Sequence, residues 1–428
     1  MASARFLGLD FGTSGARACV IAANGEIEEL THLDFGALHD HEAAAAWRQT
    51  LFDLLAQIPI GQRKHLAALA IDGTSATVLA CDAELAPLHP PLAYHDARAI
   101  AEAERIAAVT GNHHPATGAT SGLAKVLWLT QRLGPGRSRL YLNQADWLAA
   151  LLSGRPCSDT HNALKMGLDP VTNQWPAWVA ALTDITTLPK PVRPGETVGL
   201  IDHTHAVSLN LPTDCLVRAG TTDSIAAFLA TGANQPGEAV TSLGTTLALK
   251  LLSATRVESG EYGLYSHWFG RLWLTGGASN AGGGVLRQHF DDTELAALSA
   301  RIDPQRDTGL DYYPLAQAGE RFPIRDPNLA PRLEPRPADR AEFLHALLEG
   351  LARIEALGYR RLTELGATPP VRITSCGGGA HNPAYARIRA RVLALPVEPA
   401  RMGEACYGTA RLACHGTGLF PDDGEIGS

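Results

Sequence analysis

The sequence predicts an α/β protein of two domains, each built on a mixed sheet flanked by helices. Strand-like runs alternate with helical patterns along the chain, which favours sheets covered on both faces. The length of 428 residues fits two or three domains. A strand, Gly-Thr turn, strand pattern occurs once in each half, at Gly12-Thr13 and at Gly244-Thr245. This repeat suggests two similar domains facing one another.

The composition excludes several classes of protein. Apolar residues make up 45% of the chain and charged residues 19%, as in an ordinary globular protein. The formal charge of −8 and the lack of a basic run argue against nucleic-acid binding. No apolar run approaches the length of a membrane span. The seven cysteines show no paired spacing, which indicates reduced thiols. We therefore expect a cytoplasmic protein without nucleic-acid or membrane partners.

The chain opens with a hairpin built around an acidic residue. In the segment Leu7–Arg17 an apolar run ends at Asp10, and two glycines and two hydroxyl residues follow. This is not a Walker A loop, because no Gly-Lys-Ser/Thr follows. Residues 16–22 resemble a strand that stops at Asn24-Gly25, a strong hairpin signal. The loop therefore joins two antiparallel strands, and its amides and hydroxyls could hold a magnesium-bound phosphate.

A second acidic turn follows further along the chain. We expect a third strand over 27–35, a helix over 42–58 and a compact apolar strand over 66–71. That strand ends in Asp72-Gly73-Thr74-Ser75, and 76–81 forms the next strand. Because polar ligands bind where the strands of an open sheet end, this turn is a candidate second wall of the same cleft.

A third acidic residue follows a less regular region. Residues 166–212 are rich in proline and predict surface loops and short helices. Residues 215–219 form a short strand, and a helix then opens with Asp223 or Ser224 near its N-terminus, where an acid or hydroxyl satisfies free amides. Further back, Lys125 and Trp128 are expected to pack and pair locally.

Asp10, Asp72 and Asp223 thus all end strands beside glycine and hydroxyl residues. Each alone has a simple interpretation as an acid that caps a turn. Three such acids facing one crevice are costly unless a cation or a polar ligand compensates their charge.

Glycine loops mark the second half of the chain. Gly244-Thr245, Gly282–Gly284 and Gly377–Gly379 could each be a plain tight turn. Helices start after two of them, and together they are typical of backbone cradles for phosphate and ribose.

The second half also contains the clearest helix of the chain. Its apolar residues keep helical spacing from residue 338 onwards, and Gly358 is a plausible terminator. A strand over 371–374, a helix starting at Asn382 and a small-residue helix over 404–413 complete the chain.

These motifs resemble the FGGY family of carbohydrate kinases, within the actin-like, ribonuclease-H-like ATPase superfamily. The first phosphate motif of that family is similar to LGLDFGTSGARACVI, its catalytic-aspartate segment to AGTTDSIAAF and its second phosphate motif to TSLGTTLALK. Its adenosine motif is similar to TSCGGGAHNP, and its final crossing helix to GEACYGTARLA. The resemblance implies two actin-like domains with a cleft between them. Residues 1–231 plus 404–428 would bind the sugar and carry catalysis, and residues 232–403 would bind the nucleotide.

Within the family, the segments LDFGTSGARA, AIDGTSATV, NQADWL, AGTTDSIAAFLATGA and GLDYYPL together resemble the D-ribulose kinases of cyanobacteria and plants. The loop at 72–75 differs from the xylulose kinase loop, and the hydroxyl at Ser121 lies one place from its usual position in the family signature. We therefore expect conversion of D-ribulose to D-ribulose 5-phosphate. The alternatives are a D-xylulose or other polyol or ketose kinase, or an actin-like or chaperone-like ATPase without a small-molecule acceptor.

The resemblance and the chemistry of phosphoryl transfer together imply residue roles. Asp223 is the expected general base, and Asp10 the second catalytic carboxylate. Both would ligate Mg²⁺, and ATP would be the phosphoryl donor. Nucleotide contacts are expected from Gly12, Thr13, Ser14, Arg17, Gly244, Thr245, Gly282, Gly378, Gly379 and Asn382. Sugar contacts are expected from Asp10, Asp72, Ser75, Asp96 and Asp223. Domain closure would complete the site, and the protein would act as a monomer or homodimer.

Overall fold

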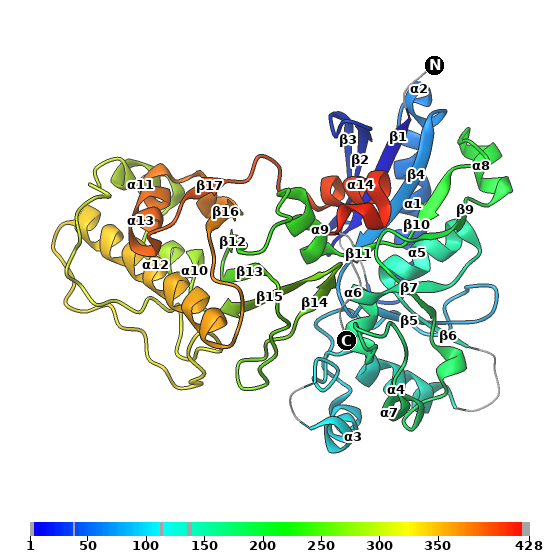
Figure 1. Cartoon of the computed structure of the whole chain (residues 1–428), viewed down its shortest axis with the longest axis horizontal. Coiled ribbons are helices and arrows are strands. Elements are labelled where there is room, and N and C mark those ends of the chain that lie inside the picture. Colours follow the sequence, from blue (N-terminus) through cyan, green and yellow to red (C-terminus); the bar gives the residue numbers. More distant parts are fainter. Residues whose placement is uncertain (1–3, 37–38, 112–113, 135–138, 422–428) are drawn as a thin grey trace. The chain divides into compact units, whose positions relative to one another are not determined.

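The computed structural model describes residues 4–36, 39–111, 114–134 and 139–421. The chain folds into two compact units, one formed by Met1–Gly232 with Glu404–Asp422 and the other by Ala233–Gly403 (Figure 1). We call them unit 1 and unit 2.

Unit 1 is built on a seven-stranded mixed sheet. Its strand order is β3-β2-β1-β4-β10-β9, and β11 also pairs with β4. The strands are β1 (Arg5–Phe11), β2 (Gly15–Ala22), β3 (Ile27–Asp34), β4 (Leu66–Gly73), β9 (Thr197–Leu200), β10 (Leu216–Arg218) and β11 (Thr221–Thr222). The strands β1 and β2 pair antiparallel, whereas β1 and β4 pair parallel. The predicted opening hairpin is therefore confirmed.

Residues 166–212 contain the expected loops and short helices, and they also contain strands that the sequence did not predict. Strand β9 lies in this region and pairs antiparallel with β10 at the edge of the sheet. A further strand, β8 (Lys190–Val192), pairs with β7 (Cys157–Asp159) in a separate two-stranded sheet. These strands are three or four residues long and contain glycine or proline, so they show no hydrophobic period.

Both faces of the unit 1 sheet are covered by helices. The apolar side chains of β1, such as Leu7 and Leu9, alternate along the strand and pack in the same core as Leu51 and Leu54 of α1 (Ala43–Gln57). On the opposite face, α14 (Ala405–His415) lies against β1, β4 and α9 (Asp223–Ala230). A Cβ at Gly8 would lie 2.1 Å from the Cys406 carbonyl oxygen, so only glycine allows this approach.

Several of the remaining elements of unit 1 contribute to a second, smaller core. Strand β5 (Val78–Cys81) pairs with β6 (Leu140–Asn143), and the helices α3 (Ile100–Thr110) and α4 (Gly122–Leu133) pack against each other. The other helices are α2 (Ile60–Arg63), α5 (Gln144–Ser153), α6 (Thr160–Ala163), η1 (Leu164–Met166), α7 (Ala177–Ala180), η2 (Ile185–Thr187), α8 (His203–Leu209) and η4 (Gly416–Leu419).

Unit 2 is built on a six-stranded mixed sheet of order β14-β15-β13-β12-β16-β17. The strands are β12 (Glu238–Leu243), β13 (Leu247–Ser253), β14 (His267–Phe269), β15 (Leu272–Ser279), β16 (Arg372–Cys376) and β17 (Val397–Pro399). Its helices are α10 (Gly283–Arg287), α11 (Asp292–Ser299), α12 (Arg340–Glu364), η3 (Gly378–His381) and α13 (Pro383–Leu393). As in unit 1, an antiparallel hairpin, β12 with β13, is followed by a parallel partner, β16. The predicted fold class of two mixed sheets flanked by helices is therefore confirmed.

The long helix α12, drawn yellow to orange in Figure 1, does not end at Gly358 as predicted. It continues to Glu364, and Gly366, with φ of +100°, follows its end. A Cβ at Gly358 would lie 2.7 Å from the Leu249 side chain and 3.1 Å from that of Phe322. Gly358 therefore allows the helix to pack closely on the sheet and does not terminate it.

A buried ion pair joins the helices of unit 2 to its sheet. Glu355 of α12 and Arg389 of α13 are both fully buried, and the guanidinium donates two hydrogen bonds of 2.6 Å to the carboxylate. Arg389 also donates to Ser375 of β16 at 2.5 Å, and Thr241 of β12 donates to Glu355 at 2.5 Å. Two helices and two strands thus meet at one charged pair.

Candidate active site

Three carboxylates of unit 1 gather at one edge of its sheet. The register of the parallel strands pairs Asp10 of β1 with Asp72 of β4, and Thr221 of β11 with the same Asp72. Asp223 follows β11 and begins α9. Asp10 is 4% exposed and Asp72 is fully buried. The structure therefore brings together the three strand-end acids that the sequence singled out.

Burial raises the pKa values of two of these groups. Burial raises the pKa of Asp10. A hydrogen bond with Asp72 and the Arg17 guanidinium at 3.4 Å act to lower this pKa but do not outweigh burial. The pKa of Asp72 is raised well above its usual range by complete burial and by the charge of Asp10. The Thr409 hydroxyl of α14 donates to Asp72 Oδ2. Asp72 is therefore the member of the pair that holds a proton more readily.

Asp223 occupies a different environment from the other two acids. It is half-buried at the first position of α9, after Thr222 at the N-cap. Its Oδ1 accepts a hydrogen bond of 2.6 Å from the Ser224 amide. A helix N-terminus stabilises negative charge, so this position favours the charged form of a carboxylate.

The turn of the opening hairpin offers hydroxyl groups at its tip. Thr13 and Ser14 are exposed, whereas the Gly12 amide donates to the Gly15 carbonyl at 3.0 Å and closes the turn. The expectation that the Gly12 amide points to a ligand therefore does not agree with this arrangement. Arg17, expected at the nucleotide, lies beside the Asp10 carboxylate.

Two further residues expected to contact the sugar, Ser75 and Asp96, lie on loops. Ser75 is half-buried in the loop that follows β4. Asp96 accepts two hydrogen bonds of 2.9 Å from Arg98 Nε. Partial burial acts to raise the pKa of Asp96, but its hydrogen bonds and pairing with Arg98 lower it overall. Lys125 contacts both loops.

The prediction of local pairing for Lys125 is wrong. Its fully buried Nζ donates to the carbonyl oxygens of Ala76 and Ala93, each at 2.7 Å, and of Tyr94 at 3.3 Å. The sequence offered one signal of this burial. Lys125 lies among apolar residues on α4, where Gly122–Leu127 are all buried.

Unit 2 contains a cavity of about 810 Å³, within the range of small-molecule sites. Four of the predicted nucleotide-binding residues line it, namely Gly244, Gly378, Gly379 and Asn382. Its apolar lining includes Leu243, Leu247, Leu286, Leu295, Ile302, Leu348 and Leu351. The cavity thus combines a glycine-rich rim with an apolar wall, an arrangement that suits a nucleoside and its phosphates.

Asn382 is fixed at the start of a helix that borders the cavity. Its side chain accepts a hydrogen bond of 3.1 Å from the Tyr385 amide and donates one of 2.8 Å to Ser299 of α11. Tyr385 also lines the cavity, and its buried hydroxyl has no hydrogen-bond partner among the described residues. Sequence reasoning did not single out Ser299 or Tyr385, because neither belongs to a glycine loop.

Two turns of unit 2 are packed on each other. The Gly283 amide donates to the Gly244 carbonyl at 2.8 Å, and a Cβ at Gly282 would lie 2.6 Å from the Thr245 carbonyl oxygen. Gly283 and not Gly282 lines the cavity. The Thr245 hydroxyl accepts a hydrogen bond of 2.6 Å from Arg287. Gly282 therefore serves the packing of the two turns.

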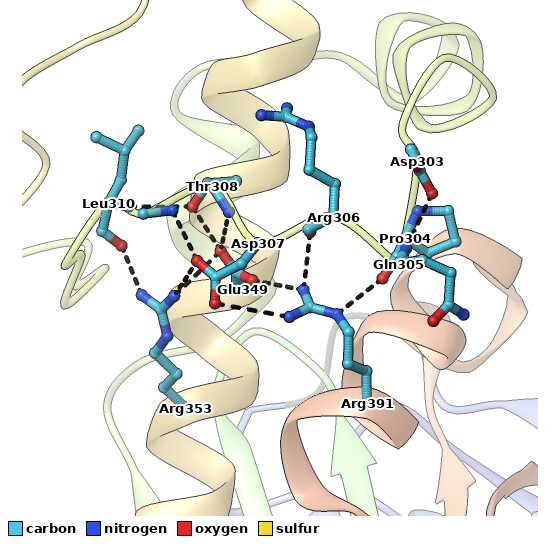
Figure 2. Close-up of polar contacts among 11 residues, drawn as sticks. Asp303, Pro304, Gln305, Arg306, Asp307, Thr308, Leu310, Glu349, Arg353 and Arg391 are labelled. Atoms are coloured by element: carbon cyan, nitrogen blue, oxygen red, sulfur yellow. Dashed lines mark hydrogen bonds and ion pairs between the residues drawn. The ribbon is translucent and has the colours of Figure 1, made fainter.

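A charged cluster, shown in Figure 2, holds the loop that supplies Pro304 to the cavity wall. Arg391 of α13 donates to the Pro304 carbonyl at 2.9 Å and to buried Glu349 of α12 at 2.5 Å. The Thr308 amide donates to Glu349 at 3.1 Å, and Arg353 donates to the Leu310 carbonyl at 2.5 Å. The loop is thus anchored at several points to α12 and α13.

The carboxylates of unit 1 can be compared with the needs of Mg²⁺. Within the part of the chain that the structure describes, no group of three or more His, Cys, Asp or Glu side chains could by itself hold a metal ion. Mg²⁺ bound to a nucleotide usually takes only one or two carboxylates, with phosphate oxygens and waters completing its shell. Asp10, whose buried carboxyl group lies next to Asp72, fits that limited role.

The comparison with known proteins decides the family. The N-terminal domain model of the FGGY family of carbohydrate kinases matches residues 5–230, and its C-terminal domain model matches residues 239–417. The chain belongs to the FGGY family. FGGY kinases are phosphotransferases that use ATP, so the match favours a carbohydrate kinase over a filament-forming or chaperone ATPase.

Similar proteins within the FGGY family act on different substrates. A glycerol kinase from Gloeobacter violaceus is 24% identical, over 99% of this chain and 90% of the relative. A xylulose kinase from Klebsiella pneumoniae is 24% identical, over 87% of this chain and 82% of the relative. The crystal structure of a xylulose kinase from Brucella ovis superposes with a TM-score of 0.83 at 23% identity, over 98% of this chain and 93% of that one. None of the helices in the described ranges is both long and apolar enough to cross a bilayer.

Proposed function

We propose that this FGGY kinase phosphorylates the terminal hydroxyl of D-ribulose, with ATP as donor and Mg²⁺ as cofactor, to give D-ribulose 5-phosphate. The observation that carries the proposal is the cluster of Asp10, Asp72 and Asp223 at one sheet edge. The loop from Asp72 to Ser75 supports a ketopentose, because it resembles the corresponding loop of D-ribulose kinases.

In the proposed reaction, Asp223 accepts the proton of the terminal sugar hydroxyl. The hydroxyl oxygen forms a bond to the γ-phosphorus of ATP, the bond to the β–γ bridging oxygen breaks, and ADP leaves. Mg²⁺, held through Asp10 and Asp223, would neutralise charge on the phosphates. Asp10 would also contact the sugar.

The other roles divide between specificity and nucleotide binding. Asp72, Ser75 and Asp96 would recognise sugar hydroxyls, and a site built for hydroxyl groups rejects analogues that lack them. The proposed nucleotide contacts in unit 1 are Thr13, Ser14 and Arg17, with Gly12 shaping the turn. Those in unit 2 are Gly244, Thr245, Gly378, Gly379 and Asn382, with Gly282 supporting the Gly244 turn.

D-xylulose is a second candidate substrate, because proteins similar to this chain are xylulose kinases. The test is sugar-dependent ADP release from the full chain with ATP and Mg²⁺, measured on D-ribulose, D-xylulose, L-ribulose and glycerol. The proposal expects the highest kcat/KM with D-ribulose. A higher value with another acceptor would overturn the substrate assignment. If no acceptor raises ADP release above the basal rate, the kinase mechanism proposed for these residues is wrong.

A further inference from the structure

Lys125 on α4 is a fully buried lysine whose hydrogen-bonding capacity is completely used. An ammonium group has three N–H donors, and three backbone carbonyl oxygens accept them, those of Ala76 and Ala93 at 2.7 Å and that of Tyr94 at 3.3 Å. These acceptors lie 31 to 49 residues away in the sequence. Lys125 therefore links two separate loops.

The first loop follows the carboxylate Asp72. Ala76, next to Ser75, has a φ of +60°, a region that residues with a Cβ rarely adopt. Its carbonyl accepts the Lys125 bond, while Thr74 is held on the other side by its amide, which donates to Gln144 Oε1 at 3.0 Å. The strained backbone beside Ser75 is thus fixed by contacts on both sides.

The second loop carries Asp96. The Ala93 carbonyl that accepts from Lys125 also accepts a 2.9 Å hydrogen bond from the Asp96 amide. One turn further along α4, the ring of Trp128 lies 5.2 Å from the guanidinium carbon of Arg98, and Arg98 binds the Asp96 carboxylate. The same helix therefore holds this loop through a cation and through an aromatic ring.

The charge state agrees with this arrangement. Burial lowers the pKa of Lys125 to about 8, with Asp96 acting to raise it and Lys165 to lower it further. At neutral pH the ammonium form therefore predominates and keeps all three donors. Burying a charge is costly unless it is hydrogen-bonded, and an apolar side chain would fill the same space without that cost.

We propose that Lys125 is a positioning residue that fixes the two loops of the acceptor-sugar site relative to each other and so sets the affinity for the sugar. The inference rests on the proposed function, because the sugar contacts are assigned to Asp72, Ser75 and Asp96. Lys125 itself does not touch the substrate in this scheme. Without it, both loops would lose a shared anchor, and small misplacements of reacting groups cost up to about 10²-fold in rate.

The experiment compares Lys125→Met with Lys165→Met, which removes a neighbouring positive charge but no contact to either loop among the hydrogen bonds described. Steady-state constants for D-ribulose and for ATP are measured separately, together with thermal unfolding and ADP binding. For Lys125→Met we expect kcat/KM for the sugar to fall by about 10²-fold, with a raised sugar KM. The KM for ATP should change by less than about twofold, as should all constants of Lys165→Met.

Two further measurements keep the test decisive if Lys125→Met does not fold. Lys125→Gln retains two donors and should show an intermediate sugar KM. In the wild type, raising the pH through about 8 converts the ammonium group to an amine with two N–H donors, so the sugar KM should rise while the KM for ATP stays constant.

The outcomes separate the two proposals. A wild-type protein that shows no sugar-dependent ADP release overturns the proposed function. If the wild type is active but folded Lys125→Met or Lys125→Gln keeps the wild-type sugar KM, only the proposed role of Lys125 is overturned. Equal losses for sugar and ATP, accompanied by lower thermal stability, also overturn it, because they indicate a purely structural lysine.

Discussion

Removing one member of the buried pair Glu355–Arg389 should destabilise unit 2 strongly. In Arg389→Met, Glu355 remains fully buried and loses two hydrogen bonds of 2.6 Å, while Ser375 loses one of 2.5 Å. Truncating one partner of such a pair leaves an uncompensated charge and costs about 3–5 kcal/mol. We therefore expect a loss of about 4 kcal/mol, which lowers the melting temperature of a domain of this size by about 8–16 °C.

The effect should also reach the cavity, because β16 and α13 flank the loop Gly377–Gly379. Hydrogen exchange followed in peptides of α12 and α13 measures the loss within unit 2, and calorimetry with ADP measures the affinity of the cavity. We expect faster exchange in both helices and weaker ADP binding. Exchange in peptides of unit 1 should not change.

The double variant Glu355→Leu with Arg389→Met is the matched control. It leaves no buried charge, so it should be more stable than either single variant. Single variants that lose less than about 1 kcal/mol, or a double variant that loses the sum of both, would show that the pair is not coupled as described.

Three further outcomes follow from the site and its supports. Asp223→Asn should retain ADP binding but lose about 10²–10⁴-fold in kcat. The control variant Asp202→Asn, at the N-cap of α8, should keep the wild-type kcat. Normal turnover by Asp223→Asn would show that Asp223 is not the general base. Tyr385→Phe should melt at the same or a higher temperature, because it removes a buried hydroxyl without a partner among the described residues; a clear fall would contradict this. Burial acts to raise the pKa of Glu349, but its hydrogen bonds with Thr308 and Arg391 lower this pKa overall, below the usual 4.5. The ionised Glu349 therefore stabilises the folded protein above pH 4.5, and this stabilisation is lost as the pH falls through the pKa of the folded state. Glu349→Gln should therefore be less stable than wild type in urea at neutral pH, with a difference that shrinks in acid, and exposed Glu364→Gln should show little difference at any pH.

Local patterns in the sequence predicted much of the fold. The hairpins β1–β2 and β12–β13 are strand, turn and strand within 18 residues (5–22) and 16 residues (238–253), so the local pattern alone marks them. The gathering of Asp10, Asp72 and Asp223 followed from the rule that parallel strands end at the same edge. The carboxylate edge of unit 1 was therefore predictable without coordinates.

Contacts between distant segments account for much of what the sequence did not predict. Gly358 has the composition signal of a helix end, but its packing against Leu249 and Phe322 decides its role. The acceptors of Lys125 lie on loops far away in the chain, so its neighbouring residues could not reveal them and suggested local pairing instead. The Gly12 amide was expected to be available to a ligand, and the turn itself uses it. For Gly358 and Lys125 tertiary contacts outweigh the local pattern, whereas the Gly12 amide is used by a hydrogen bond within its own turn.

The position of α14 has a consequence for the order in which the protein can be made. Its Thr409 hydroxyl reaches Asp72, and a Cβ at Gly408 would lie 1.9 Å from the Ala226 carbonyl oxygen. Unit 1 thus receives an essential helix only after all of unit 2 has been translated, a delay of roughly ten to thirty seconds at the usual rate of synthesis. During that interval the nascent N-terminal segment has an uncovered sheet face and an Asp72 without its hydroxyl donor. The ribosome therefore releases a protein whose carboxylate edge in unit 1 is assembled last.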